Sequence, residues 1–402
     1  MTPVPLCDRR SSGSALALAA AACLTLALAW PASAPARAPI VEQTPAQPAP
    51  QAKPESMPAA RRAALAPHRA TRANPAKTVA KGPLYAGRAD AMQVADEIAL
   101  RNQLDRTWVR RSVGQARQLP LVARLILPGP PTTAKNWGVY RSRFIDPLRI
   151  AAGVSFWRAN AATLARAERD YGVAAEIIVG IIGIETIYGR DIGNFRVLDA
   201  LATLAFDFPQ EHPRAAERRA FFLAELEQLL LLSRRSKTDP LRFKGSYAGA
   251  MGMPQFMPSS WAKYAVDFDG DGKIDLYGSA ADVIGSVAHY FKLFGWQPGM
   301  ATHYPVRFDP ALLSLDALLA PDILPTFSVA SLAAKGVVLD GEALQHPGPL
   351  ALVELQNGHA APSYFAGTEN FYTITRYNWS SYYAMAVIEL AEEVKRAMNN
   401  KP

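Results

Sequence analysis

The sequence predicts a mainly α-helical (α+β) protein with a small antiparallel β domain near its C-terminal end. First, from Tyr85 onward apolar residues recur three and four positions apart over long stretches. Second, short aromatic and β-branched runs replace this spacing after Ala301. Third, the chain ends in an amphipathic segment whose apolar face must pack against the rest of the protein. With 402 residues, half of them hydrophobic, the chain is long enough for several domains.

Residues 1–34 have the pattern of a secretory signal peptide. Two arginines precede an apolar run from Ala15 to Trp30, and "ASA" at residues 32–34 is a cleavage pattern. The run is short for a membrane span. Both cysteines, Cys7 and Cys23, lie in this segment, so cleavage would leave a mature protein without thiols. An alternative that stays open is a lipoprotein signal at Cys23, which would anchor the protein to the outer membrane; we expect simple export to the periplasm instead.

Residues 35–82 form a predicted disordered linker, rich in Pro, Ala and basic residues and without apolar periodicity. Residues 1–82 contain ten Lys and Arg against three Asp and Glu, and therefore hold +7 of the formal net charge of +8. The rest of the chain is nearly neutral. The folded part therefore gives no electrostatic argument for binding nucleic acid.

Helical spacing organises residues 83–300, which we divide into a helical domain (83–150) and a helical core (151–300). The sequences "ADAMQVADEIALRNQL", "VSFWRANAATLARAERDYG" and "AAERRAFFLAELEQLLLLSRR" all show it. In the last of these, one stripe of an amphipathic helix is formed by Phe222, Leu226, Leu229, Leu230 and Ser233.

Residues 301–376 are predicted to form the small β domain. "ALVELQ", "SYFAGT" and "FYTITRY" have the composition of strands and are separated by "NGHAAP" and "EN". In residues 377–402, Tyr383, Val387 and Leu390 share an apolar face. We expect this last segment to be a helix that packs back on the core.

The stretch "VGIIGIETIYGR", residues 179–190, contains one carboxylate, Glu185, in an otherwise apolar run. Its length favours a helix over a buried strand, with Gly189 as the terminator. Apolar surroundings disfavour the ionised carboxylate, so the pKa should rise, and a glutamic acid that stays protonated near neutral pH can act as a general acid. The local pattern fits equally well a structural ion pair with Arg190 or Arg196.

A second informative stretch is "KGSYAGAMGMPQFMPSSW", residues 244–261. Its small residues let the backbone approach another molecule closely, while Ser246 and Gln255 offer uncharged polar groups beside aromatic rings. Such a surface suits a sugar. A loop packed between helices explains the same pattern equally well.

The order and spacing of several motifs resemble the membrane-bound lytic murein transglycosylase B family. The motifs are "NWGVYRSRFIDP", "GIIGIETIYGR", "LDALATLAFDFP", "KGSYAGAMGMPQFMPSSW", "VDFDGDGKIDLYGSAADVIGSVAHYFKLFGW" and "NFYTITRYNWSSYYAMAVIEL", and the similarity covers residues 88–400. It implies a lysozyme-like helical catalytic core with an additional helical domain and a small β domain.

The resemblance also implies roles for single residues. Glu185 takes the place of the sole catalytic acid and base, and the glycan-binding groove around it is implied to contain Ser246, Gln255, Asn378, Tyr383, Tyr140 and Phe221. Phe221 lacks the hydroxyl that relatives can carry at this position, which removes one hydrogen bond to the substrate. Pro254 precedes Gln255 where some relatives have Gly, which stiffens the loop.

A usual glycosidase needs two carboxylates, and no second acid stands out near Glu185 in these motifs. By the resemblance, Glu185 protonates the oxygen between N-acetylmuramic acid and N-acetylglucosamine, then takes the proton of the muramyl C6 hydroxyl, which closes onto C1. The expected activity is therefore that of a peptidoglycan lytic transglycosylase, a lyase that gives 1,6-anhydromuramyl products without water. The alternatives are a hydrolytic muramidase and a non-catalytic peptidoglycan-binding scaffold.

The stretch "DFDGDGKIDLYGSAAD", residues 267–282, begins as an EF-hand loop. Positions 1, 3, 5 and 7 are supplied by Asp267, Asp269, Asp271 and the carbonyl of Lys273. Position 12 is Gly278 instead of Glu, and the resemblance makes Asp282 the late bidentate ligand. We expect structural Ca²⁺ here; the alternative is a solvated acidic turn.

Other cofactors and partners are not indicated. The six histidines lack close ligand spacing for zinc, and no phosphate-binding or dinucleotide fingerprint occurs, so no organic cofactor is expected. The expected partner is the glycan strand of peptidoglycan, and association with the machinery of cell-wall synthesis or division is compatible with it. We expect a monomer.

Overall fold

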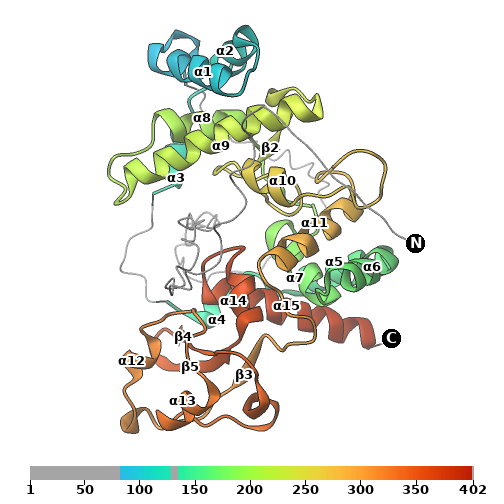
Figure 1. The fold of residues 1–402 in the computed structure, drawn as a ribbon, viewed down its shortest axis with the longest axis vertical. Coiled ribbons are helices and arrows are strands. Elements are labelled where there is room, and N and C mark those ends of the chain that lie inside the picture. The colour runs from blue at the N-terminus through green and yellow to red at the C-terminus, as the bar shows by residue number, and fades with distance from the viewer. Residues whose placement is uncertain (1–81, 128–134, 401–402) are drawn as a thin grey trace, which may run out of the picture. The chain divides into compact units, whose positions relative to one another are not determined.

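The computed structural model describes residues 82–127 and 135–400 (Figure 1). The predicted signal peptide and residues 35–81 of the predicted linker lie outside this part. The described residues form a mainly helical fold with a small three-stranded antiparallel sheet, as the sequence predicts, and a two-stranded sheet that was not predicted. Among their helices, none is both long and apolar enough to cross a membrane.

The helices up to and including the one that carries Glu185 are α1 (Ala89–Arg101), α2 (Arg106–Gly114), α3 (Pro120–Leu125), α4 (Trp137–Arg141), α5 (Pro147–Ala159), α6 (Ala161–Tyr171) and α7 (Ala175–Thr186). Those after it are α8 (Val197–Phe206), α9 (Ala215–Ser236), α10 (Pro258–Tyr264), α11 (Ala280–Leu293), α12 (Leu315–Leu319), α13 (Val329–Ala334), α14 (Glu369–Thr375) and α15 (Ser381–Asn399). The strands are β1 (Phe195–Arg196), β2 (Lys244–Gly245), β3 (His303–Pro305), β4 (Ala351–Asn357) and β5 (Ala360–Gly367).

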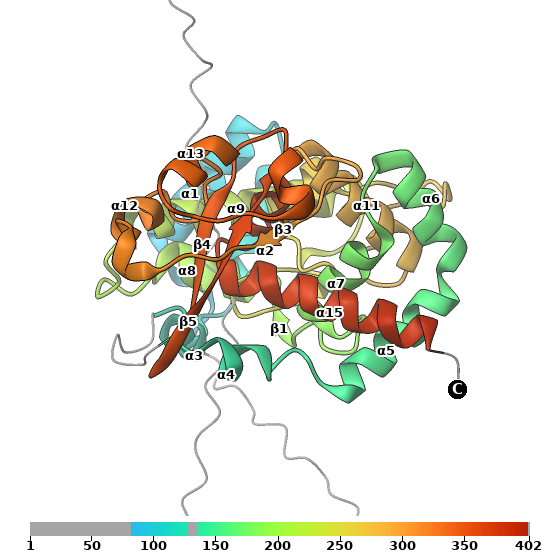
Figure 2. The same ribbon diagram turned by 90° about the horizontal axis from the view of Figure 1, so that it is seen from below.

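Helix α7 lies at the centre of the main hydrophobic core, because nearly all of its residues are buried. It packs closely on α15, the final helix (Figure 2). Gly180 permits this approach, since a Cβ at that position would lie 2.7 Å from the carbonyl oxygen of Val387. The predicted apolar face of α15, with Tyr383, Val387 and Leu390, is buried here. Two elements far apart in the sequence thus form one rigid pair.

The end of α7 differs from the prediction. The helix stops at Thr186, before the predicted terminator Gly189, and Ile187, Tyr188 and Gly189 all have positive φ. A β-branched residue in this left-handed region is uncommon and strained. The ring of Tyr188 packs on Phe156, with ring centroids 5.2 Å apart. Packing of that tyrosine therefore fixes where the helix turns away.

The three-stranded sheet has the order β3-β5-β4, and its edge strand β4 is buried on both faces. Along β4, Ala351, Val353 and Leu355 belong to the main core, while Leu352 belongs to a second, smaller core. This alternation is the period of two expected for a strand. The small core also contains Leu318 of α12 and Leu332 of α13.

One predicted strand is wrong. "FYTITRY" does not join the sheet, because Phe371–Thr375 lie in helix α14. The side chain of Thr368 caps this helix by accepting the backbone N–H groups of Asn370 and Phe371, and Phe371 and Ile374 bury one face. The cap and the tertiary burial outweigh the strand preference of the β-branched residues.

Candidate active site

Glu185 lies in the last turn of α7, where its residue is half-buried although the surrounding helix is almost fully buried. Burial raises the pKa of Glu185 to about 7, and a hydrogen bond from the Tyr383 hydroxyl acts in the opposite direction. At neutral pH this carboxyl therefore exists in both protonation states. A group of this kind can donate a proton in one step and accept one in the next.

The ion-pair alternative for Glu185 is wrong. Arg196 pairs instead with Asp199 at 2.6 Å, and Asp199 also accepts the backbone N–H of Arg117 at 2.9 Å. Within residues 82–127 and 135–400, neither Arg190 nor any other cation forms a salt bridge with Glu185. The charge of Glu185, when present, is therefore stabilised by hydrogen bonding alone.

Three tyrosines surround Glu185. The hydroxyl of Tyr383, at the start of α15, donates a hydrogen bond to Oε1 of Glu185 at 2.5 Å. Burial, and next the negative charge of Glu185, raise the pKa of Tyr140, Tyr377 and Tyr383. These hydroxyls therefore stay protonated, as donors, at neutral pH. Sequence reasoning found Tyr383 and Tyr140 but missed Tyr377, whose only signal was its place beside Asn378.

Residues 244–261, the second stretch that the sequence singled out, begin with strand β2. This strand pairs with β1, and the chain turns at Ser246. The Ser246 hydroxyl oxygen accepts the backbone N–H of Ala250 at 3.1 Å, so this side chain stabilises the turn. Gln255 has positive φ, and its Nε2 donates to the carbonyls of Gly252 (2.9 Å) and Ile192 (3.2 Å). With the amide nitrogen held in this way, Gln255 presents Oε1 as its remaining polar atom.

Hydrogen bonds from Thr186 and Tyr377 hold residues 244–261 close to Glu185. The Thr186 hydroxyl donates to the carbonyl of Met253 at 2.8 Å and accepts the N–H of Gly189 at 3.0 Å. The Tyr377 hydroxyl donates to the carbonyl of Pro254 at 2.5 Å. Thr186 is fully buried, and a polar residue directly after Glu185 in an apolar run is a signal that sequence reasoning passed over. Thr186 therefore holds the loop at Met253 to α7, the helix that carries Glu185.

In the described part of the chain, the remaining predicted glycan-binding residues, Asn378, Phe221 and Tyr140, make no hydrogen bond to Glu185. The side-chain oxygen Oδ1 of Asn378 is buried and has no hydrogen-bond partner among the described residues, so this acceptor is unsatisfied. Phe221 lies on α9 against Phe222, with ring centroids 5.1 Å apart. Tyr140 packs on Trp137 and Tyr382 from α4 and α15.

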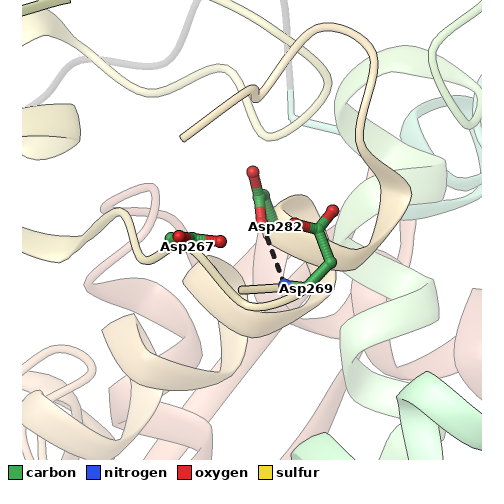
Figure 3. Close-up of side chains that lie close together, drawn as sticks. All are labelled: Asp267, Asp269 and Asp282. Carbon is green, nitrogen blue, oxygen red and sulfur yellow. Dashed lines mark hydrogen bonds between the residues drawn. The ribbon is translucent and has the colours of Figure 1, made fainter. Parts of the chain in front are cut away.

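The predicted calcium loop brings three carboxylates together. Asp267, Asp269 and Asp282 each offer one oxygen, all within 4.8 Å of one another (Figure 3). Asp282, in the first turn of α11, is buried and accepts the backbone N–H groups of Phe268 (2.7 Å) and Asp275 (2.8 Å). Hard oxygen donors of this kind fit Ca²⁺.

Two of the predicted ligands lie outside that cluster. The carboxylate of Asp271 accepts the backbone N–H of Lys273 at 2.8 Å and is not one of the three converging groups. Lys273 was predicted to contribute only its carbonyl. The cluster therefore contains the first, second and last of the five predicted ligands, Asp267, Asp269 and Asp282.

Leu276 and Tyr277, which follow the acidic part of the loop, connect it to residues 244–261. The backbone carbonyl of Leu276 accepts the N–H of Met253 at 2.9 Å, and the Tyr277 hydroxyl donates to the carbonyl of Lys244 at 2.7 Å. Gly252 allows this contact, since a Cβ there would lie 2.6 Å from the Leu276 oxygen. A change in the loop would therefore reach Ser246 and Gln255 through the backbone.

Comparison with known proteins gives a consistent result. The family described as "Transglycosylase SLT domain" matches residues 87–392. The membrane-bound lytic murein transglycosylase B of Escherichia coli (strain K12) is 41% identical over 322 residues, which cover 78% of this chain and 84% of that protein.

Solved structures are similar over most of their length. The E. coli lytic transglycosylase Slt35 in complex with calcium is 40% identical, with a TM-score of 0.68 over 80% of this chain and 97% of that one. SltB3 from Pseudomonas aeruginosa in complex with NAG-anhNAM-pentapeptide is 31% identical, with a TM-score of 0.62 over 76% and 78% of the two chains. The predicted mainly α, lysozyme-like fold is confirmed by these neighbours.

Proposed function

Because the chain belongs to the transglycosylase SLT domain family, we propose how its site performs the reaction of that family. The protein is a lytic transglycosylase of peptidoglycan, a lyase that cleaves the glycan strand. We assign both proton transfers of this reaction to Glu185. The single observation that carries the assignment is a half-buried glutamate, with its pKa raised to about 7, that receives a tyrosine hydrogen bond.

In the first step, protonated Glu185 donates its proton to the oxygen between N-acetylmuramic acid and N-acetylglucosamine. The bond from that oxygen to C1 breaks, and the leaving sugar departs as an alcohol. Positive charge then develops at C1. The substrate's own acetamido group and uncharged dipoles of the protein stabilise this charge. The raised pKa supports this step, since it keeps the acid form populated near neutral pH.

In the second step, ionised Glu185 takes the proton of the muramyl C6 hydroxyl. The oxygen of that hydroxyl bonds to C1 and closes a 1,6-anhydro ring, so no water is consumed and Glu185 returns to its acid form. The Tyr383 hydroxyl supports the ionised form in between, because it donates a hydrogen bond that lowers the pKa of Glu185.

We propose that substrate contacts come from the residues tied to this glutamate. Sugar amides and hydroxyls can form hydrogen bonds with the unsatisfied Oδ1 of Asn378, the Oε1 of Gln255 and the hydroxyl of Ser246. Tyr140 and Phe221 offer aromatic faces for the apolar sides of sugar rings.

We propose that Ca²⁺ binds between Asp267, Asp269 and Asp282, with further oxygens from Asp271 and the Lys273 carbonyl. The calcium complex of the E. coli relative supports the choice of ion. The ion would supply charge neutralisation to the three carboxylates and no chemistry at the scissile bond. The loop residues Leu276 and Tyr277 carry the effect to the glycan-binding stretch through their hydrogen bonds to Met253 and Lys244.

Export to the periplasm remains our proposal for residues 1–34, with residues 35–82 as a linker to the folded part. The name of the E. coli relative, which is membrane-bound, supports a place at the cell envelope. The domain division of residues 83–402 is likewise a proposal, and the separate small core of the β part supports its boundary near Ala301.

Digestion of purified sacculi tests the function. The wild-type protein is expected to release muropeptides with 1,6-anhydro ends, read by mass spectrometry, whereas Glu185→Gln should release none and still bind the glycan. Reducing ends formed with uptake of one water would favour the hydrolytic alternative. Retained turnover in Glu185→Gln would refute the role of this residue.

A further inference from the structure

A cavity of about 550 Å³ opens between α2 and the C-terminal end of α9. None of the residues around it belongs to the candidate active site or the calcium loop. Its chemistry is set by one aromatic ring, one amide, three cations and one carboxylate, from Trp108, Gln115, Arg111, Arg234, Lys237 and Asp239. A volume of this order is typical of sites for small ligands, which span about 300–1,000 Å³.

The three cations of this cavity are exposed to solvent. Within the part of the chain that the structure describes, Arg111, Arg234 and Lys237 form no salt bridge. Asp239 is engaged as a helix cap, where its carboxylate accepts the backbone N–H of Leu241 at 2.9 Å. The cavity therefore carries a local surplus of positive charge in a folded part that is nearly neutral as a whole. Such a surplus points to a ligand of opposite charge.

Hydrogen bonds hold the backbone on the α2 side of the cavity. Trp108 is half-buried; its backbone N–H is bound by Asp105 at 2.6 Å and its carbonyl by the Ser112 hydroxyl at 2.8 Å. On the rim, the carbonyl of Gln115 accepts a hydrogen bond from Arg196 at 3.1 Å.

We propose that this cavity binds the stem peptide of a peptidoglycan strand through its free carboxylates. Arginine pairs with carboxylate in a bidentate geometry, and the face of Trp108 covers apolar parts of the peptide. A concave site of this size fits a short peptide better than a flat anionic membrane surface. The identity of the ligand as a stem peptide rests on the proposed function, whereas the preference for a ligand with several negative charges rests on the cavity alone.

Calorimetric titration of the full-length protein with a sugar-free stem pentapeptide tests the proposal. The wild type should bind it, and the double variant Arg111→Gln, Arg234→Gln should bind about tenfold more weakly or worse, since two charge-assisted contacts are lost. Arg235→Gln is the control for the change at Arg234, because it removes one charge from the next position of α9 without touching the cavity. It should bind as the wild type does.

Three results would overturn the proposal. They are absence of binding to the wild type, equal binding of a peptide whose carboxylates are amidated, and an equal loss in Arg235→Gln. Binding of anionic lipid vesicles that is lost in the double variant, without peptide binding, would reassign the cavity to a membrane. The titration needs no turnover, so failure of the proposed catalytic role of Glu185 would leave its result unaffected.

Discussion

The hydroxyl of Tyr383 donates a hydrogen bond to Oε1 of Glu185 across 2.5 Å, although the two residues are 198 positions apart. The contact depends on the close packing of α7 and α15, which Gly180 permits. It couples the protonation of the glutamate to the position of the last helix. Because the hydrogen bond is made to the carboxylate, it favours the ionised form and opposes the effect of burial.

Tyr383→Phe should therefore move the pH dependence of cleavage. Activity in the wild type is expected to fall above the Glu185 pKa of about 7, because the acid form is needed first. Loss of the hydrogen bond raises this pKa, so the alkaline limb of kcat/KM should shift to higher pH, with a rate loss of about tenfold from poorer positioning. The measurement is kcat/KM against pH on a soluble glycan fragment.

Tyr140→Phe is the control, since the Tyr140 hydroxyl makes no hydrogen bond to Glu185. An equal shift of the alkaline limb in Tyr140→Phe would contradict the assignment.

Glu185→Gln should change stability in a pH-dependent way. The folded-state pKa of about 7 lies above the ordinary value of 4.5, so the folded protein binds this proton more tightly than the unfolded chain. That stability is fully present below pH 4.5 and is lost as the pH rises through 7. The loss is at most about 3 kcal/mol, and smaller because the residue is partly exposed.

The variant, which cannot ionise, should thus gain Tm relative to wild type between pH 4 and pH 8. Thermal unfolding at both pH values measures this difference. A constant difference in Tm would show that Glu185 titrates as an exposed carboxylate does.

The sequence was sufficient where a local pattern carried the information. The stripe of α9 from Phe222 to Ser233 was predicted from spacing, and β4 was predicted from the strand composition of "ALVELQ". The apolar run around Glu185 likewise indicated a raised pKa, because the surrounding residues follow from helical periodicity.

Spacing could not predict features that depend on tertiary contacts. "FYTITRY" has strand composition but folds as α14, because Thr368 caps it and Phe371 is buried in the main core. The early end of α7 at Ile187 depends on packing of Tyr188 against Phe156. The bond from Thr186 to Met253 joins segments 67 positions apart, and only the folded chain brings them together.

Gly180→Ala should destabilise the protein, although alanine is the better helix former. In an open helix the exchange would gain about 1 kcal/mol. Here the new Cβ would lie 2.7 Å from the backbone carbonyl of Val387, so α15 must shift, and overpacking of this kind costs about 1–3 kcal/mol. Urea unfolding measures the difference.

Gly138→Ala in α4 is the matched control for that experiment. Its Cβ would find no atom closer than 3.4 Å, and Gly138 itself is exposed, so the variant should be neutral or slightly more stable. Stabilisation by Gly180→Ala as well would mean that α7 and α15 do not approach each other as closely as the structure places them.

Removal of calcium should lower both stability and activity. An ion bound by Asp267, Asp269 and Asp282 stabilises only the folded state, by about 2.7 kcal/mol at a hundredfold excess over Kd. Without it, repulsion among the three carboxylates loosens the loop, and Leu276 and Tyr277 no longer fix Met253 and Lys244. We expect Tm to rise with added Ca²⁺, and cleavage of sacculi to fall after chelation and recover with Ca²⁺.

Asp269→Asn should lose the calcium-dependent rise in Tm while keeping the fold, because Asp269 is exposed. Mg²⁺ should replace Ca²⁺ poorly. An identical Tm in chelator and in calcium would assign these carboxylates to an ordinary solvated turn, in which Asp282 serves only as the acceptor for the N–H groups of Phe268 and Asp275.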